Sequence, residues 1–204
     1  MNFFHALMEK PWLAQGAPAD PHDGAGYSLP TAKIGLRVFL AVVTVLFSLL
    51  VVSYTERMAV GDWRSLPDMW LLWANTALLI LSSVGLHWAR VSVDRGRIDG
   101  VKLGLLAGGG LAFAFLAGQL LVAQQLTDLG YFVSTNPAVS FFYLITVLHG
   151  LHLLGGLVAL GKTADKVWGG FEMAQVRLSV ELCAVYWHFL LLVWLVLFGL
   201  LLLT

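Results

Sequence analysis

The segment AVYWHFLLLVWLVLFGLLLLT, Ala184–Thr204, decides the fold class of this chain, because it is almost entirely apolar beyond His188. A helix of about 20 apolar residues is long enough to cross the hydrocarbon core of a bilayer, which is about 30 Å thick. The segment therefore predicts a transmembrane helix. It also raises the question of what a histidine does in such a helix, with Glu181 two helical turns before it.

The composition extends this prediction to the whole chain, which has 204 residues, 59% of them hydrophobic and 12% charged. A soluble domain of this length cannot bury so much apolar surface. The alternating pattern of membrane β-strands is absent, so the apolar runs are predicted to be helices. The expected fold class is all-α, a polytopic membrane bundle of five transmembrane helices, at about Lys33–Tyr54, Pro67–Trp88, Leu103–Gln124, Val139–Gly161 and Leu182–Leu203.

The basic residues predict how this bundle is oriented. Two of the twelve, Arg57 and Arg64, lie in the first loop, and ten lie on the side of the N-terminus: Lys10, Lys33, Arg37, Arg90, Arg95, Arg97, Lys102, Lys162, Lys166 and Arg177. Cytoplasmic loops carry the excess of Lys and Arg, so the N-terminus is expected in the cytoplasm and the C-terminus in the periplasm. Residues 1–30 include a stretch rich in Gly, Pro, Ala and Asp and are expected to form a flexible tail. Residues 31–204 are expected to form the transmembrane domain. No cleaved signal peptide is expected, and a net charge of zero gives no reason to expect a nucleic acid partner.

Small residues in the third and fourth spans predict close helix contacts. Gly104 and Gly108 lie four residues apart in the third span, and Gly150 and Gly155 lie in the fourth. Where lipid surrounds a bundle, small residues let helix backbones approach each other. These four glycines are therefore predicted to pack against neighbouring helices. Polar side chains of the second span are expected to hydrogen-bond across helices: Asn75, Ser82 and Ser83.

Ionisable residues inside the spans lie on defined helix faces. His149 and His152 are three residues apart and share one face, and Glu181 and His188 share a face two turns apart. Because ionisable side chains are costly in lipid, they are expected to face the protein or a partner subunit. The last two spans are therefore expected to turn these faces toward each other, which would point Glu181 and His188 at the fourth span, or toward a partner subunit.

Three interpretations of these polar residues stay open on the residues alone. Histidines 149, 152 and 188 could ligate a metal, or His149 and His188 a bis-His haem. A di-metal bundle, however, needs several inward carboxylates with Glu-x-x-His pairs, and Glu181 does not lie three residues before a histidine. The second interpretation is a proton relay. The third is structural, with imidazoles and a carboxylate that tie helices together.

Three segments resemble a known family, with the resemblance extending over about residues 31–204. FFYLITVLHGLHLLGG (Phe141–Gly156), YWHFLLLVWLVLF (Tyr186–Phe198) and LWANTALLILSSVGLHWA (Leu72–Ala89) are similar to subunit III of the haem-copper oxidases, the cytochrome c and quinol oxidase superfamily, in its five-helix bacterial form. The combination of HGLH, YWHF and a Glu seven residues before the last His is the specific signal.

The resemblance implies a non-catalytic subunit that holds no haem, copper or other metal and has no catalytic centre, in a proton-translocating complex that reduces oxygen to water. Such a subunit packs on subunit I, supports assembly, stability and proton uptake, and is associated with phospholipid. The complex would lie in the bacterial cytoplasmic membrane, with cytochrome c as the expected donor, although no sequence feature fixes the donor. The family's interhelix bonding residues would be His149, His152, Glu181, Tyr186, Trp187 and His188.

The chain also departs from the family pattern. Longer members have two further N-terminal helices, and this chain aligns from their third. Thr44 stands where those members carry a Glu, and Leu191 where many carry an Asp. Close relatives accompany nitric oxide reductases, so the chain could also be an accessory subunit of that enzyme. Two further functions stay open: a bis-His haem electron carrier that uses His149 and His188, and a small transporter.

Overall fold

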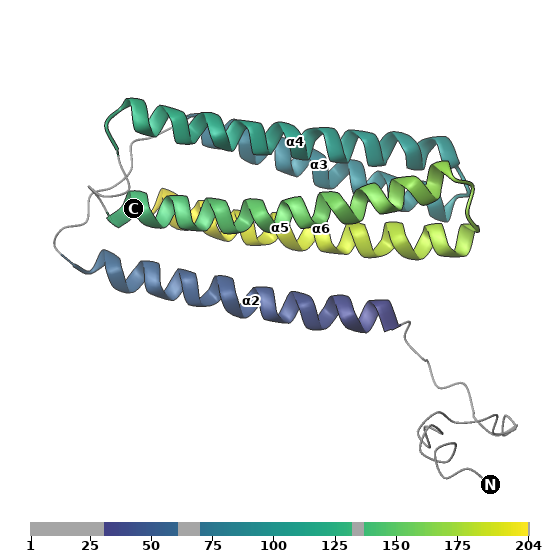
Figure 1. Cartoon of the computed structure of the whole chain (residues 1–204), viewed down its shortest axis with the longest axis horizontal. Helices are drawn as coiled ribbons and strands as arrows, with labels where there is room; N and C mark the ends of the chain where they lie inside the picture. The colour runs from purple at the N-terminus through teal and green to yellow at the C-terminus, as the bar shows by residue number, and fades with distance from the viewer. Residues whose placement is uncertain (1–30, 61–69, 132–136, 204) are drawn as a thin grey trace, which may run out of the picture. The chain divides into compact units, whose positions relative to one another are not determined.

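A computed structural model describes residues 31–60, 70–131 and 137–203 of the chain. In these ranges the chain forms five long helices that run side by side (Figure 1). Each is long and apolar enough to cross a membrane, which confirms the predicted all-α fold of five spans. The expected tail and Pro67, the expected start of the second span, lie outside the described residues. The helices are α2 (Thr31–Met58), α3 (Trp70–Asp94), α4 (Ile98–Asp128), α5 (Pro137–Trp168) and α6 (Met173–Leu202).

The helices extend beyond most of the predicted spans. α5, for example, continues seven residues beyond Gly161, through Lys162 and Lys166, to Trp168. A helix keeps its backbone hydrogen bonds in lipid and in water, so it does not have to end where the hydrocarbon ends. The apolar length of a segment therefore predicts the span, and the helix itself continues until a turn signal is reached.

Four of the helices form a closed bundle, and the fifth lies outside it. The neighbours in the bundle are α3 with α4, α4 with α5, α5 with α6, and α6 with α3. α2 lies along α5 and α6 (Figure 1), and within the described residues none of its α-carbons comes within 8 Å of an α-carbon in another helix. It reaches the bundle through large side chains: the rings of Phe39 and Tyr186 are 6.0 Å apart, and those of Tyr54 and Phe141 are 5.6 Å apart.

The closest backbone contact in the bundle joins α3 to α4. A methyl group added at Gly104 would lie 2.7 Å from the carbonyl oxygen of Gly85 and 2.8 Å from the backbone nitrogen of Ala89. At Gly108 it would lie 2.7 Å from the Cγ atom of Leu86. The two helices can approach this closely only because α4 presents no side chain at either position.

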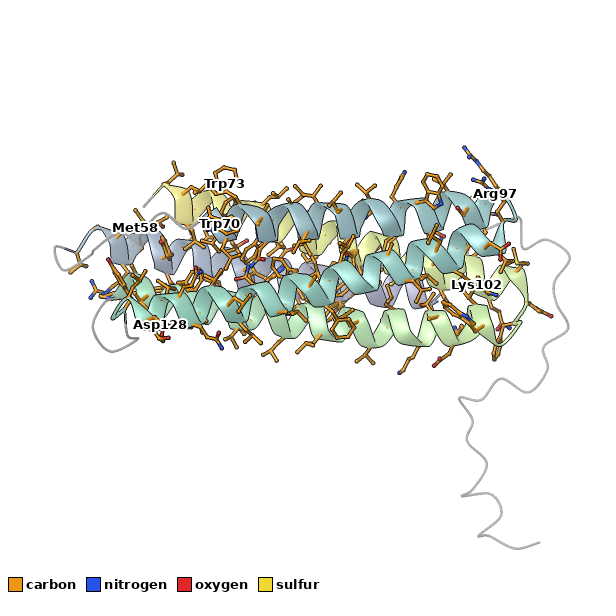
Figure 2. The ribbon with its side chains drawn as sticks, turned by 90° about the horizontal axis from the view of Figure 1, so that it is seen from above. Met58, Trp70, Trp73, Arg97, Lys102 and Asp128 are labelled. Carbon is orange, nitrogen blue, oxygen red and sulfur yellow. The ribbon has the colours of Figure 1, made fainter. Side chains whose placement is uncertain are left out.

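The two ends of the bundle differ in charge. Arg97 and Lys102 lie at one end, and Trp70, Trp73 and Asp128 lie at the other (Figure 2). At the first end Gly96, with φ of 67°, allows the tight turn between α3 and α4, and Arg177 pairs with Asp94 at 2.8 Å. We call this end the basic end, because its described residues include Lys33, Arg95, Arg97, Lys102, Lys162, Lys166 and Arg177.

Candidate functional site

Trp187 joins three helices through one hydroxyl group. Its indole Nε1–H donates to the Oγ atom of Ser82 in α3 at 2.9 Å, and that hydroxyl donates to the carbonyl oxygen of Gly108 in α4 at 2.6 Å. Trp187 and Ser82 are fully buried. Trp187, which the family resemblance implied as a bonding residue, is thus a donor between helices, and Ser82 of the second predicted span is its acceptor.

A second tryptophan makes a similar contact two turns further along α6. Trp194 Nε1–H donates to the Oγ1 atom of Thr76 in α3 at 3.0 Å, and the Thr76 hydroxyl donates to the carbonyl oxygen of Leu72 at 2.8 Å. Trp194 is fully buried. Neither residue stood out as a bonding position in the sequence, because Trp also marks membrane interfaces and Thr often bonds to its own helix.

His149 lies inside the bundle in an aromatic environment. Its ring centroid is 5.1 Å from that of Trp194, 6.0 Å from Phe115 and 6.3 Å from Phe47. The residue is fully buried, and neither ring nitrogen has a hydrogen-bond partner among the described residues. His149 is therefore placed among α2, α4, α5 and α6, but its polar atoms are not used by a protein group.

His152, one turn further on, faces α2 and α6. Its Nδ1 atom lies 2.7 Å from the carbonyl oxygen of Leu148, and only a protonated nitrogen can bond to that acceptor. The carbonyl oxygen of His152 accepts a hydrogen bond of 2.8 Å from the hydroxyl of Tyr186. The ring of Phe47 packs against the imidazole at 5.4 Å. These contacts connect α2, α5 and α6.

Glu181 pairs with the first predicted span, not with the fourth as expected. The Nζ atom of Lys33 in α2 lies 2.8 Å from the Oε1 atom of Glu181 in α6. Both side chains are about 30% exposed, at 27% and 31%. The ion pair therefore fastens α2 to the bundle at the basic end, and Lys33 is a partner that the helical spacing of α6 did not reveal.

His188 does not face the fourth span either, because it lies on the outer surface of α3 and α6. Its Nδ1 atom is 3.4 Å from the hydroxyl of Ser83, and its ring is 5.7 Å from the ring of His87. Both histidines are exposed on the described chain. His149 packs against Trp194, six residues or about 9 Å along α6 from His188. The two imidazoles do not face each other, so the geometry does not provide the ligand pair that a bis-His haem requires.

The predicted packing glycines of α5 are not the closest contacts of that helix. A methyl group at Gly155 would meet no atom within 4 Å, and one at Gly150 would only touch Leu116 at 3.7 Å. Gly156 takes the close position instead, where a methyl group would lie 2.8 Å from the ring of Tyr186 and 2.9 Å from that of Trp187. The small residue that α5 needs against α6 is therefore one position further along.

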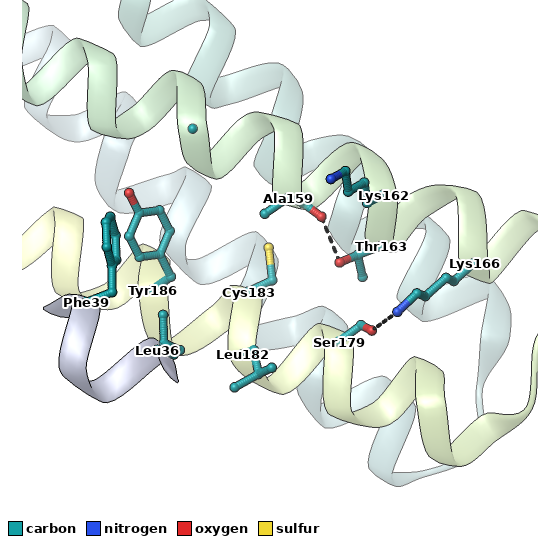
Figure 3. Close-up of a pocket in the computed structure, with 11 residues that line it drawn as sticks. Leu36, Phe39, Ala159, Lys162, Thr163, Lys166, Ser179, Leu182, Cys183 and Tyr186 are labelled. Atoms are coloured by element: carbon teal, nitrogen blue, oxygen red, sulfur yellow. Dashed lines mark hydrogen bonds between the residues drawn. The ribbon is translucent and has the colours of Figure 1, made fainter. Parts of the chain in front are cut away.

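Two cavities lie beside α2. The larger, of about 410 Å³, we call the α2 cavity (Figure 3). It is mostly apolar, with Lys162 and Lys166 toward the basic end, and Lys166 donates to the Ser179 hydroxyl at 2.9 Å. A second cavity of about 320 Å³ lies nearer the other end, between α2 and α6. The residues that line the α2 cavity are Leu36, Phe39, Gly155, Ala159, Lys162, Thr163, Lys166, Ser179, Leu182, Cys183 and Tyr186.

Chemically, two of the motif residues, Tyr186 and Trp187, donate to a carbonyl or hydroxyl group of another helix, and Glu181 accepts from Lys33. In the described part of the chain, no three His, Cys, Asp or Glu side chains gather as they would around a metal ion. The arrangement can hold five helices together, and it also provides an apolar cavity with a basic end.

The sequence is similar to known proteins over most of its length. A family model described as cytochrome c oxidase subunit III matches residues 33–203. The chain is 31% identical over 173 residues to cytochrome c oxidase subunit 3 of Thermostichus vulcanus, which covers 82% of this chain and 85% of that protein. It is 30% identical over 171 residues to a probable cytochrome c oxidase subunit 3 of Mycobacterium leprae, over 81% and 84% of the two chains.

A third relative extends the match. The chain is 29% identical over 191 residues to cytochrome c oxidase subunit 3 of Synechocystis sp., over 89% of this chain and 78% of that protein. All five described helices fall almost entirely within the residues that the family model matches. This chain, a multi-pass membrane protein, belongs to the cytochrome c oxidase subunit III family.

Proposed function

We propose that this chain is the non-catalytic third subunit of a bacterial terminal oxidase that reduces oxygen to water with electrons from cytochrome c. Its membership of the family and its bacterial relatives, which carry the name of that subunit, support the proposal. The chain would lie in the cytoplasmic membrane and pack on subunit I, which would hold haem and copper. By that contact it would support assembly, stability and proton uptake.

Two histidines on the outer surface, His87 and His188, support the proposal that a partner subunit packs against this chain. His87 and His188 are exposed on a face of α3 and α6 whose other exposed residues include Val84 and Val185. An imidazole N–H that faces hydrocarbon has no acceptor, and ionisable residues in membranes therefore face protein or water. A partner helix against this face would provide the acceptors. We accordingly assign subunit I to the surface around these two histidines.

Replacing both histidines by leucine is expected to weaken the contact with the partner. Interhelix hydrogen bonds in membranes contribute about 1 kcal/mol each, so losing two should lower the association constant by about tenfold or more. The measurement is the haem content per tagged chain after purification in mild detergent at increasing dilution. Leu120→Ala serves as the control, because Leu120 is 67% exposed on α4.

The control separates this assignment from a general loss of stability. If the histidine variant keeps its haem-bearing partners and Leu120→Ala loses them, the contact face lies on α4 instead. The partners identified in the same preparation also distinguish an oxidase subunit from an accessory subunit of a nitric oxide reductase, since the latter would bring subunits that reduce nitric oxide and not oxygen.

The basic end is proposed to face the cytoplasm, together with residues 1–30, with the C-terminus in the periplasm. The excess of Lys and Arg at that end of the bundle supports this orientation. A cysteine at Asp128 is expected to react with a membrane-impermeant maleimide in intact spheroplasts, and a cysteine at Arg97 only after permeabilisation. Labelling in the opposite order would reverse the orientation. The native Cys183 is buried and provides a low background.

The α2 cavity is proposed to bind a phospholipid with an anionic headgroup. Its apolar walls suit an acyl chain, and Lys162 and Lys166 at the basic end suit a phosphate. Each such lysine contributes about 1 kcal/mol near a membrane surface, so changing both to glutamine should lower the retained anionic lipid by about tenfold or more. Mass spectrometry of lipids in the purified chain is the measurement. Lys102→Gln is the control, since Lys102 contacts Trp168 outside the cavity. Equal lipid in both variants would contradict the proposal.

A further inference from the structure

Besides Ser92, which lies 17 residues from Asn75 along α3, four polar side chains inside the bundle have hydrogen-bonding atoms without a partner among the described residues. They are the Nδ2 atom of Asn75, both amide atoms of Gln119, the Oγ1 atom of Thr146 and both ring nitrogens of His149. Asn75, Gln119 and His149 are 1%, 6% and 0% exposed. The first lies in α3, the second in α4 and the last two in α5. We call these four side chains the polar layer.

Contacts around Trp194 place the polar layer at one depth of the bundle. The Trp194 ring lies 5.1 Å from His149 and 5.0 Å from Phe115, and its N–H bonds to Thr76. The layer's asparagine directly precedes Thr76, and its glutamine follows Phe115 by about one helical turn. Thr146 lies one turn before His149 on the same face of α5. Three helices therefore bring their unpartnered groups to the same level.

Gly118 lets the Asn75 amide of the layer lie against α4. A methyl group added at Gly118 would collide with Oδ1 of Asn75 and lie 2.7 Å from its Cγ atom. The Asn75 amide therefore lies against the backbone of α4, immediately beside the position of Gln119. A side chain at Gly118 would push it away.

The groups of the polar layer suit water better than another ligand. Together they offer amide and hydroxyl donors, amide and hydroxyl acceptors and an imidazole, but no carboxylate to balance a bound cation. A buried water needs two to four polar partners and can donate and accept at once. Inside a membrane bundle no bulk solvent can satisfy these atoms instead. We propose that the polar layer binds ordered water molecules that bridge α3, α4 and α5.

Water-edited solid-state NMR of the full chain in liposomes tests this proposal. With ¹⁵N-labelled histidine and tryptophan, the ring nitrogens of His149 are expected to receive polarisation from water although the residue is fully buried. The indole of Trp187 is the dry reference, because it is fully buried and bonded to Ser82. The His149 signal is identified by its loss in His149→Phe. We expect its build-up from water to be at least several-fold faster than that of Trp187.

Two variants of α4 make the test specific to the polar layer. Gln119→Leu removes both amide atoms from the layer and is expected to slow the transfer to His149 several-fold. Gln124→Leu, on an exposed position of the same helix, should leave it unchanged. The proposal would be overturned if, in the wild type, the His149 signal built up from water no faster than the Trp187 signal. Direct hydrogen bonds among the four side chains in a high-resolution density map would also overturn it. The density map comes from the wild-type protein and does not depend on whether a variant folds.

Discussion

The Gly104→Val variant is expected to lose about 3 kcal/mol of unfolding free energy, because the new side chain has no space between α3 and α4. Even its first carbon would lie 2.7 Å from the Gly85 carbonyl oxygen and 2.8 Å from the Ala89 backbone nitrogen. These are backbone atoms, which cannot rotate out of the way as a flexible side chain can. The two helices would have to separate, and the Ser82 hydrogen bond to Gly108 would be lost with them.

Gly110→Val is the matched control for this variant. It makes the same change six residues away on the same helix, and a methyl group there would meet no atom within 4 Å. The difference in helix propensity is therefore the same in both variants, and only the packing differs. Reversible unfolding of the purified chain in mixed micelles, followed by circular dichroism, measures both. Equal losses of stability would contradict the close contact of α3 with α4.

Trp187→Ala is expected to cost about 3–5 kcal/mol, the range for removing a large aromatic side chain from a core. Trp187 is fully buried, and it packs against Gly156 in α5 while it donates to Ser82 in α3. The variant would leave a cavity between three helices and remove the donor to the hydroxyl. Trp70→Ala, at a residue that is 74% exposed, is expected to change the same free energy by less than about 1 kcal/mol.

Ser82→Ala separates the hydrogen bond from the volume of the indole. It keeps the tryptophan in place but removes the acceptor of the Trp187 N–H and the donor to the Gly108 carbonyl. Leaving such buried groups unpaired should cost about 1–3 kcal/mol. A Ser82→Ala variant as stable as the wild type, together with a Trp187→Ala variant that loses several kcal/mol, would show that packing and not bonding holds α6 to α3.

The five spans could be predicted from the sequence because the thickness of a bilayer fixes their length. Each run of about 20 apolar residues corresponds to one helix, and the repeat of Gly104 and Gly108 predicted a closely packed face of α4, which in the structure lies against α3. Ser82, expected to bond across helices, does so. These features depend on local composition and on helical periodicity, which a sequence contains directly.

The partners of the polar motif residues could not be predicted in the same way. Periodicity places Glu181 and His188 on one face of α6, but it does not say which helix lies opposite. Because α2 lies outside the closed ring of the other four, Glu181 meets Lys33, whereas His188 lies beside α3. The order of helices around a bundle depends on packing between distant segments.

The choice between neighbouring positions on one helix also could not be predicted. Adjacent residues on a helix point about 100° apart, so Gly155 and Gly156 face different neighbours although both are small. The structure turns Gly156 toward Tyr186 and Trp187 and leaves Gly155 beside the α2 cavity. A pattern of glycines therefore indicates that a helix is closely packed, but not which member of the pair makes the contact.

The most direct test of the proposed role is purification of the tagged chain in mild detergent from the membranes of its own host, with an optical spectrum and identification of every subunit. The account predicts that haem-bearing oxidase subunits accompany the chain. When the chain is stripped from the complex, the haem signal should stay with those subunits and be absent from the isolated chain. A chain that purifies alone and keeps one haem of its own would contradict it.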